Sequence, residues 1–549
     1  MKKYIVIATV ALFCACSDFV ENYDYESILP EGIFYKSDDD FIKAIDAVYY
    51  QLENGDDDLF GRSYFWESCV SGAGDMIHGT NRGTEYTRID NFEMDGTETK
   101  LKTTNGRIGQ LLALSNNVIY QLLKKGENNL SPVCKRILGE AYWIRGYVHF
   151  LSAYRMGRAD NGVPFDRYED FNPYIYRIPE QRATVMDNYA LIIEDLEKAV
   201  ELLPAYCVLD YDKNNYGRAT KTSVWAVMVK TYAYWAAHDK SKWEKIPALV
   251  DKIENEGRRA LLPEYADVFT VEKGNWSSEE IFSLNGNSKV PTTNYFTITF
   301  YAKTWNPSVN GCMQNGWGTY KPTLNVYKAF VDGDKRRKVA ILEYGDEFEL
   351  YGSTFQFTDP NDVESGFMCG KYIDPYRYPG HQYTNNNLDG RTDLNVPVIR
   401  FAEMLLFKAE ALIEMGQASQ AAAPLNRIAE RAGLGANRYS SPTILDVMRE
   451  RRCELTFEYA DRFGDLRRWV MSTYDQTARN AALAELREKK MIRKYVDRAN
   501  VDSEYTEVNC AQDDGYRREQ FNPDIHIAFP WNPDDVKTAG GKLKQNKGY

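Results

Sequence analysis

The chain has 549 residues, of which 44% are hydrophobic and 27% charged, so it can bury a large core as ordinary globular proteins do. Its formal net charge of −12 argues against nucleic-acid binding, because that function requires a basic stripe. Aromatic residues make up 13% of the chain, including 39 Tyr and 10 Trp. Most such rings fill cores or cover helices, but some can stack on the apolar faces of sugar rings.

The first residues are typical of a secretory leader. Two lysines precede an apolar run over residues 4–13, which is too short to span a bilayer. The run ends in Phe-Cys-Ala-Cys, with the small Ala15 directly before Cys16. The pattern predicts a signal peptide over residues 1–15 and lipidation of Cys16, with several acyl chains as the membrane anchor. A plain signal peptide that is cleaved nearby is the alternative.

Residues 16–35 follow as a tether, and apolar periodicity then predicts a series of helices up to residue 264. Ser37 is a good N-cap for the first helix. Short connections indicate three tetratricopeptide-like hairpins before residue 260. Tryptophans in the apolar stripes of helices should be core residues. The predicted helices cover residues 41–52, 108–123, 135–154, 185–203, 222–236 and 245–255, and the core tryptophans are Trp143, Trp225, Trp235 and Trp469.

The character of the chain changes from residue 265 to about residue 395, where Gly, Asn, Thr and aromatic residues dominate. Alternation over residues 295–301 predicts a strand. Long irregular insertions between helical blocks are where binding residues concentrate.

A second helical block is predicted from about residue 396 to residue 470, with three helices in succession. Gly416 and Gly433 should end the first two, which form a fourth hairpin over residues 400–432, because glycine tolerates a left-handed backbone. Pro424 must lie in the first turn of the second helix or kink it. Ser441-Pro442 predicts the start of the third helix.

Charged residues of both signs crowd the stretch that follows. Arg451 with Glu454, and Glu458 with Arg462, stand at the spacing of helix neighbours. Because the acids are interleaved with the bases, we expect a salt-bridged helix corner rather than a polyanion-binding patch.

Blocks of sequence along nearly the whole chain resemble the RagB/SusD family. The matching blocks are GEAYWIRGYVHFLSAYRMG (139–157), NYALIIEDLEKAVELLP (188–204), GRATKTSVWAVMVKTYAYW (217–235), KPTLNVYKAFVDGDKRR (321–337), residues 400–416, ERRCEL to DLRRW (450–469) and the terminal QNKGY (545–549). The last block resembles the family ending "QNPGY", with Lys547 replacing proline.

The resemblance implies a mainly α-helical fold, with a tetratricopeptide-like hairpin scaffold and a long irregular, loop-rich insertion. It divides the chain into an N-terminal half (36–264) and a C-terminal half (265–549). It further implies an outer-membrane lipoprotein of Bacteroidetes that captures a nutrient, usually a glycan, for a SusC-like TonB-dependent transporter. The acidic start after Cys16, Ser17-Asp18, resembles the signal that sends such lipoproteins to the outer leaflet.

The sugar-stacking aromatic residues of the family come from loops in corresponding parts of the chain, although no short motif fixes individual residues. Trp305 and Trp317 are the best pair, because each lies among Asn, Gly and Pro. The candidate carbohydrate-binding residues are Trp66, Tyr86, Tyr295, Tyr301, Trp305, Trp317 and Tyr320, with Tyr64, Asp75, Asn81 and Trp276 as further candidates.

Catalytic and cofactor motifs such as HExxH, GxSxG and the phosphate-binding GxxxxGK[ST] do not occur, so we expect neither an enzyme nor a cofactor. The acidic run Asp56-Asp57-Asp58 leaves a structural Ca²⁺ open, although it lacks EF-hand spacing. Three alternatives to glycan capture remain: a peptide-binding family member, a scaffold that completes the transporter without binding strongly, and a surface glycosidase, whose carboxylate pair would be set by distance in space.

Overall fold

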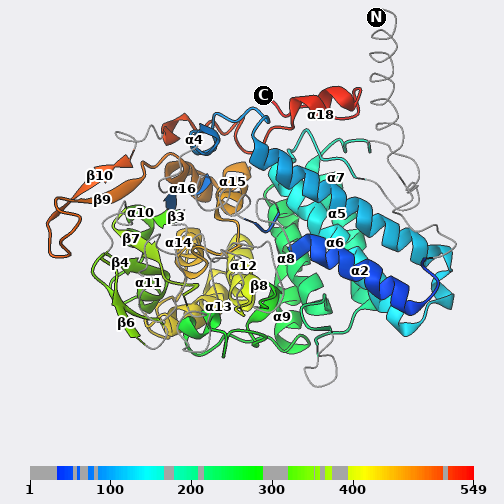
Figure 1. Cartoon of the computed structure of the whole chain (residues 1–549), viewed down its shortest axis with the longest axis horizontal. Helices are drawn as coiled ribbons and strands as arrows, with labels where there is room; N and C mark the ends of the chain where they lie inside the picture. Colours follow the sequence, from blue (N-terminus) through cyan, green and yellow to red (C-terminus); the bar gives the residue numbers. More distant parts are fainter. Residues whose placement is uncertain are drawn as a thin grey trace, which may run out of the picture.

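The structure is a computed structural model, and it describes residues 34–53, 59–61, 72–78, 84–165, 179–207, 215–287, 320–350, 353–358, 365–373, 393–510 and 517–549. It is mainly helical, with a tetratricopeptide-like scaffold as predicted (Figure 1). No helix in these ranges is both long and apolar enough to cross a membrane. The predicted leader, Cys16 and the strand over residues 295–301 lie outside the described residues.

The N-terminal half is a row of helices in which each packs on the next (Figure 1). These are α2 (Asp38–Glu53), α5 (Thr99–Lys124), α6 (Pro132–Met156), α7 (Val185–Leu202), α8 (Lys221–Ala236) and α9 (Ile246–Asn255). Ser37 caps α2 as predicted, because its Oγ accepts a hydrogen bond from the Asp40 N–H at 3.3 Å. Helix α6 lies at the centre of this half, and its side chains from Ile137 to Met156 are buried.

Two predictions for this half were wrong. Helix α5 begins at Thr99 rather than Ile108, although Gly106 and Gly109 each weaken a helix by about 1 kcal/mol. Both glycines face open space, and the buried Leu101 anchors the earlier turns. Trp235 is only partly buried: its ring stacks on Tyr232 with centroids 6.4 Å apart, whereas Trp143, Trp225 and Trp469 are core residues as predicted.

The C-terminal helical block contains α12 (Phe401–Glu414), α13 (Ala418–Arg431), α14 (Ile444–Glu454), α15 (Arg462–Met471) and α16 (Gln476–Leu486). Gly416 and Gly433 follow α12 and α13 with positive φ, as predicted. Pro424 lies in the middle of α13 rather than in its first turn, which excludes the first of the two predicted alternatives and leaves the kink as a prediction. Helix α14 begins after Thr443 rather than Ser441, because Thr443 and Asp446 form a reciprocal capping box.

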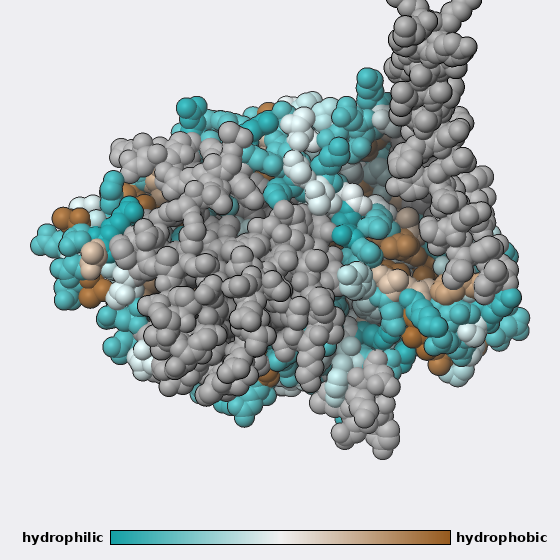
Figure 2. Space-filling view, viewed as in Figure 1, coloured by the Kyte–Doolittle hydropathy of each residue, from teal (hydrophilic) through white to brown (hydrophobic). Residues whose placement is uncertain are grey.

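The strands form two-stranded antiparallel pairs among the described residues. They are β1 (Met76–His78) with β3 (Tyr320–Pro322), β2 (Glu280–Leu284) with β8 (Val396–Arg400), β4 (Ile341–Glu343) with β7 (Phe367–Cys369), β5 (Glu347–Leu350) with β6 (Ser353–Gln356), and β9 (Met491–Tyr495) with β10 (Tyr505–Asn509). The β9–β10 hairpin projects at the left of Figure 1 and carries the exposed Val496 and Tyr505. The described surface in Figure 2 is otherwise mainly hydrophilic, with small hydrophobic groups.

The shorter helices are α4 (Thr84–Asp90), α10 (Leu324–Ala329), α11 (Lys335–Ala340) and α18 (Pro533–Thr538). The chain ends beside α6, where the buried Asn546 side chain donates to the carbonyl oxygens of Met156 and Phe529, both at 2.7 Å. The C-terminal residues are therefore part of the packed structure.

Candidate functional site

The candidate site is built on the β2–β8 strand pair, which connects the loop-rich insertion to the helices. The pair runs antiparallel from Glu280 opposite Arg400 to Leu284 opposite Val396. Residues 288–319 continue from the Leu284 end, and residues 374–392 lead into the Val396 end. The segment that carries most of the predicted site residues therefore starts at this end of the strand pair.

Side-chain amides and carboxyls tie the strand ends together. Asn395 Oδ1 accepts from the Gly286 N–H at 2.9 Å, and Asn395 Nδ2 donates to Glu280 Oε2 at 3.1 Å. Asn275 accepts from the Asn395 N–H at 2.8 Å. Asn285 Nδ2 donates to Glu53 Oε1, at the end of α2, at 3.1 Å. We call Glu53, Asn275, Glu280, Asn285 and Asn395 the strand-end cluster.

Two carboxyl groups of this cluster titrate near neutral pH. Burial raises the pKa of Glu53 to about 8, against the opposing effect of the hydrogen bond from Asn285. Burial likewise raises the pKa of Glu280 to about 7, against hydrogen bonds from Asn395 and the Trp276 N–H. At pH 7 the Glu53 carboxyl is therefore mostly protonated, and the cluster carries less negative charge than its composition suggests.

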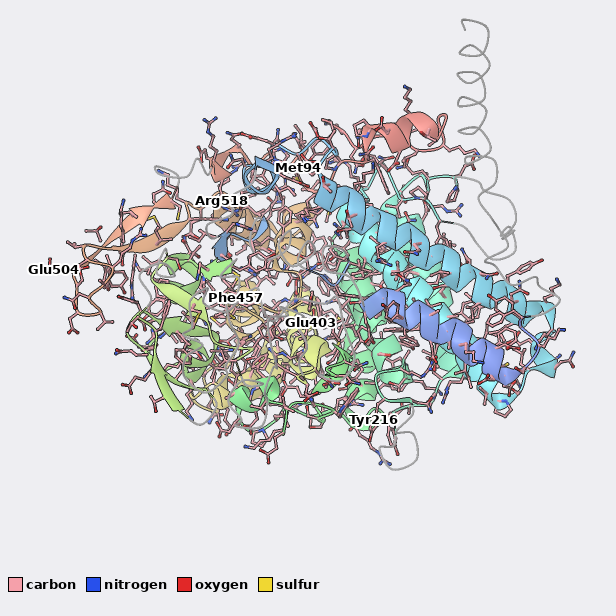
Figure 3. All side chains as sticks on the ribbon, in the orientation of Figure 1. Met94, Tyr216, Glu403, Phe457, Glu504 and Arg518 are labelled. Atoms are coloured by element: carbon pink, nitrogen blue, oxygen red, sulfur yellow. The ribbon has the colours of Figure 1, made fainter. Side chains whose placement is uncertain are left out.

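An aromatic pair adjoins the strand-end cluster. The rings of Tyr216 and Trp276 stack with centroids 5.0 Å apart and planes 20° apart, and both side chains are partly exposed. Trp276 has φ of 59°, a left-handed conformation that is uncommon for a bulky residue. Gly217, next to Tyr216, has φ of 79°, and a Cβ there would lie 2.1 Å from Asn285 Nδ2. Figure 3 shows Tyr216 at the lower edge of the molecule.

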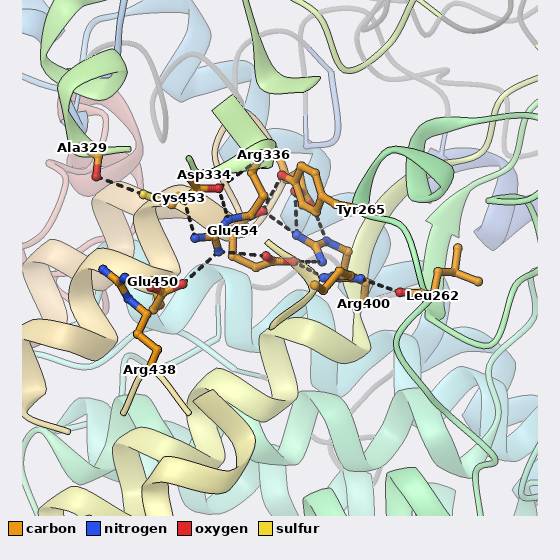
Figure 4. Close-up of polar contacts among 12 residues, drawn as sticks. Leu262, Tyr265, Ala329, Asp334, Arg336, Arg400, Arg438, Glu450, Cys453 and Glu454 are labelled. Carbon is orange, nitrogen blue, oxygen red and sulfur yellow. Dashed lines mark hydrogen bonds and ion pairs between the residues drawn. The ribbon is translucent and has the colours of Figure 1, made fainter. Parts of the chain in front are cut away.

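A buried network of arginines and glutamates supports the opposite end of the strand pair (Figure 4). Arg400 Nη1 lies 2.8 Å from Glu279 Oε1 and 2.7 Å from Glu454 Oε1. Burial alone would raise the pKa of Glu454, but Arg431, Arg400 and Arg336 together hold that pKa well below its usual range. The arginine–glutamate network comprises Glu279, Arg336, Arg400, Arg431, Glu450, Glu454 and Glu458.

The network corrects the pairing predicted from helix spacing. Arg451 pairs with Asp465 at 2.7 Å rather than with Glu454. Glu458 pairs with Arg400 at 2.6 Å, and Arg462 pairs with Glu485. The crowded charges do form a salt-bridged structure as predicted. Its partners come from distant segments because these side chains are buried, and a buried charge needs a close counter-charge.

The predicted site residues are only partly within the described residues. Trp66, Tyr295, Tyr301, Trp305 and Trp317 lie outside them, as do Tyr64 and Asn81. Tyr86 belongs to α4, in which only its backbone is described.

Three other candidates have defined surroundings. Tyr320 lies in β3 with 1% of its surface exposed, and its ring meets His78 edge-on at 6.0 Å. Asp75 is buried and pairs with Arg452 at 2.6 Å. Both therefore have packing contacts in this structure, whereas Trp276 is at the surface.

Reasoning from sequence missed the residues that position Trp276. Asn275, Glu280, Asn285 and Asn395 are polar residues at the borders of the insertion, and they gave no periodic signal. Tyr216 lies far from Trp276 in the sequence, so only the fold brings the two rings together. The Asn-Gly-Asn run over residues 285–287 was the one local sign of a special backbone there.

A separate cavity of about 800 Å³ lies between α12, α14 and α16, with Glu414, Asp475 and Lys240 among its lining residues. Burial raises the pKa of Glu414 to about 8, and a hydrogen bond with Asp475 adds to that effect. The described lining residues include no aromatic ring for stacking.

Within the described ranges, no group of three or more His, Cys, Asp or Glu residues is placed to hold a metal ion. Asp56, Asp57 and Asp58 lie outside those ranges.

The architecture defines a helical scaffold protein whose irregular insertion is held between helical blocks. Two family models match the chain: "SusD family" over residues 278–549, and "Starch-binding associating with outer membrane" over residues 85–233. The chain belongs to the RagB/SusD family.

Relatives and solved structures extend over most of the chain. It is 26% identical over 504 residues to SusD-like protein P2 of Formosa agariphila, covering 85% of this chain and 91% of that protein. A SusD-like protein of Bacteroides ovatus is 25% identical, with coverage of 85% and 82%. Surface glycan-binding protein A of Bacteroides uniformis has a TM-score of 0.70 at 20% identity, covering 93% of this chain and 99% of that one. The Bacteroides thetaiotaomicron protein of that name, in complex with laminarihexaose, has a TM-score of 0.68 at 19% identity, with coverage of 92% and 98%.

Proposed function

We propose that this protein is a surface-exposed outer-membrane lipoprotein that binds an oligosaccharide or polysaccharide and delivers it to a SusC-like TonB-dependent transporter. The observation that carries the proposal is family membership along both halves of the chain, with a fold shared by a protein solved with laminarihexaose. The division into residues 36–264 and 265–549, with the ligand face at about 265–395, belongs to the same proposal.

Binding would come from aromatic stacking and hydrogen bonds to hydroxyl groups rather than from chemistry on the sugar. Each well-placed ring contributes about 1 kcal/mol, by analogy with aromatic pairs. The proposed stacking residues are those of the insertion and the N-terminal loops, foremost Trp305 and Trp317. A family in which binding serves uptake supports a role without catalysis and without a cofactor.

Membership of this family also supports a proposal for the anchor and the location. The description of the matching N-terminal model places its members at the outer membrane. We propose that acyl chains on Cys16 hold the protein in the outer leaflet, facing the cell exterior. Protease added to intact cells should then degrade it, and full protection would place it on the periplasmic side.

Affinity electrophoresis tests glycan binding. The protein starting at Ser17 is run through gels that contain plant, host or microbial polysaccharides, with laminarin, a β-1,3-glucan, first in the panel. Retardation by one class of glycan supports the proposal and names the ligand class. Absence of retardation in every gel would contradict it and favour peptide capture or a transporter-completing role. Release of reducing ends from a bound polysaccharide would instead indicate a glycosidase.

A further inference from the structure

We propose that Tyr216 and Trp276 form a carbohydrate-contacting aromatic pair at the border of the insertion, held in place by Glu280. The inference rests on the proposed glycan-binding function and adds a defined contact to it. Trp276 was a candidate from sequence, whereas Tyr216 and Glu280 emerge from the structure.

The backbone at Trp276 is the first argument. A bulky residue at φ of 59° is strained, and such strain persists only where surrounding contacts impose it. Those contacts are present. Glu280 Oε2 accepts the Trp276 N–H at 3.2 Å, Asn275 Nδ2 donates to the Asp393 carbonyl at 2.6 Å, and Arg259 Nη1 donates to the Ser277 carbonyl at 3.1 Å.

The Tyr232–Trp235 pair shows that a Trp ring can stack on a Tyr ring without a left-handed backbone. Its rings lie 11° from parallel and are also partly exposed. They stand one turn apart on the regular helix α8, where the stacking needs no unusual backbone. The amine of Lys242 lies 4.3 Å from the Trp235 ring centroid, so that ring already makes a cation–π contact within the protein.

The surroundings fit a neutral sugar better than a charged ligand. The aromatic pair offers a flat apolar surface with a phenol as a polar handle. Glu280 and Glu53 nearby are partly buried carboxyls that accept hydrogen bonds from amides, and the one base among these contacts, Arg259, donates to the Ser277 and Glu280 carbonyls. A polyanion would find no basic cluster in these contacts, and the formal charge of −12 would repel it.

The location connects the pair to the proposed ligand face. A Cβ at Gly217 would lie 2.1 Å from Asn285 Nδ2, so the Tyr216 segment lies close against the end of β2. Asn275 is bonded to residues 393 and 395 at the start of β8. The aromatic pair is thus connected to the residues that follow β2 and to those that precede β8, which lie on the two sides of the insertion.

The test compares Trp276→Asn with the wild type in affinity gels that contain laminarin and the other polysaccharides of the panel. Asparagine tolerates a left-handed backbone, so this variant removes the ring but leaves the turn intact. We expect about five-fold weaker retention by the retarding glycan, and a similar loss for Tyr216→Ala. Trp276→Tyr should keep most of the retention. The matched control, Trp235→Leu, should leave it unchanged.

The outcomes separate this inference from the proposed function. If the wild type is retarded and Trp276→Asn is retarded equally, the aromatic pair is structural and the inference fails, while glycan binding stands. If no glycan retards the wild type, both fail. Fluorine NMR on protein labelled with 5-fluorotryptophan covers the case in which Trp276→Asn does not fold. The Trp276 signal, assigned with Trp276→Tyr, should shift when the retarding glycan is added, and an unmoved signal overturns the inference.

Discussion

Glu279 and Glu280 are neighbours in the chain, yet their carboxyl groups belong to different networks. Glu279 accepts from Arg400 at 2.8 Å and from Arg431 at 2.6 Å, within the arginine–glutamate network. Glu280 accepts from Asn395 and from the Trp276 N–H, within the strand-end cluster. Alternation of side chains at the start of a strand explains the separation. One short segment thus joins the ionic core of the scaffold to the base of the candidate site.

The two glutamates should respond very differently to the same substitution. Glu279→Gln leaves Arg400 and Arg431 with an incomplete set of counter-charges, so we expect a loss of about 3–5 kcal/mol in the free energy of unfolding. Glu280→Gln keeps an oxygen acceptor and removes only a partial charge, so its effect should be about 1 kcal/mol or less. Urea unfolding at pH 7 measures both. Equal losses would show that the two carboxyls are not separated as described.

Stability should fall as pH rises through the neutral range. A glutamate with an ordinary pKa of 4.5 titrates in the unfolded chain well below the values of about 8 for Glu53 and about 7 for Glu280. Between about pH 4.5 and pH 8 the folded state therefore holds more protons, and each group lowers the free energy of unfolding by up to about 1.4 kcal/mol per pH unit.

Glu53→Gln, which cannot ionise, should remove part of that slope. Urea midpoints measured from pH 5 to pH 9 for the variant and the wild type test this directly. A variant whose slope equals that of the wild type would mean that Glu53 is ionised in the folded protein across this range.

Trp305 and Trp317 are predicted to stack on the ligand. Replacing both with alanine should weaken retention by the bound glycan by about five-fold per ring, with little change in melting temperature. Affinity gels and thermal melts of the same preparations give the two readings. A large drop in melting temperature would identify these residues as core instead.

Replacing Cys16 with alanine should abolish lipidation. Without the acceptor thiol no acyl chains can be attached, and the protein should leave the membrane fraction. Metabolic labelling with an alkyne fatty acid, followed by fractionation, measures both effects. Persistent acyl labelling of the Cys16→Ala protein would show that the anchor lies elsewhere.

Local signals predicted the scaffold well because helix ends are governed by neighbouring residues. Ser37, Gly416 and Gly433 act where the sequence placed them. The start of α14 was misplaced because Ser441 and Thr443 are both good caps, and only the reciprocal bond with Asp446 decides between them. The start of α5 was missed because packing of Leu101 outweighs the weak helix propensity of two glycines.

The site was harder to predict because its contacts are tertiary. Arg452 pairs with Asp75 across 377 positions of sequence, and no spacing rule reaches that far. The exposure of Trp235 and the burial of Tyr320 likewise depend on which elements pack on each side. Trp276 was a candidate by its surroundings in sequence, but its partner Tyr216 and its strained backbone could be seen only in three dimensions.

The bonds of Asn546 have a consequence for the order of folding. Its amide joins Phe529 to Met156 at the end of α6, and Met156 lies 390 positions earlier in the sequence. Because contacts between residues so far apart must overcome the entropy of closing a long loop, this contact should form late in folding, after α6 itself. The end of α6 therefore obtains this cover only when the two halves of the chain have come together.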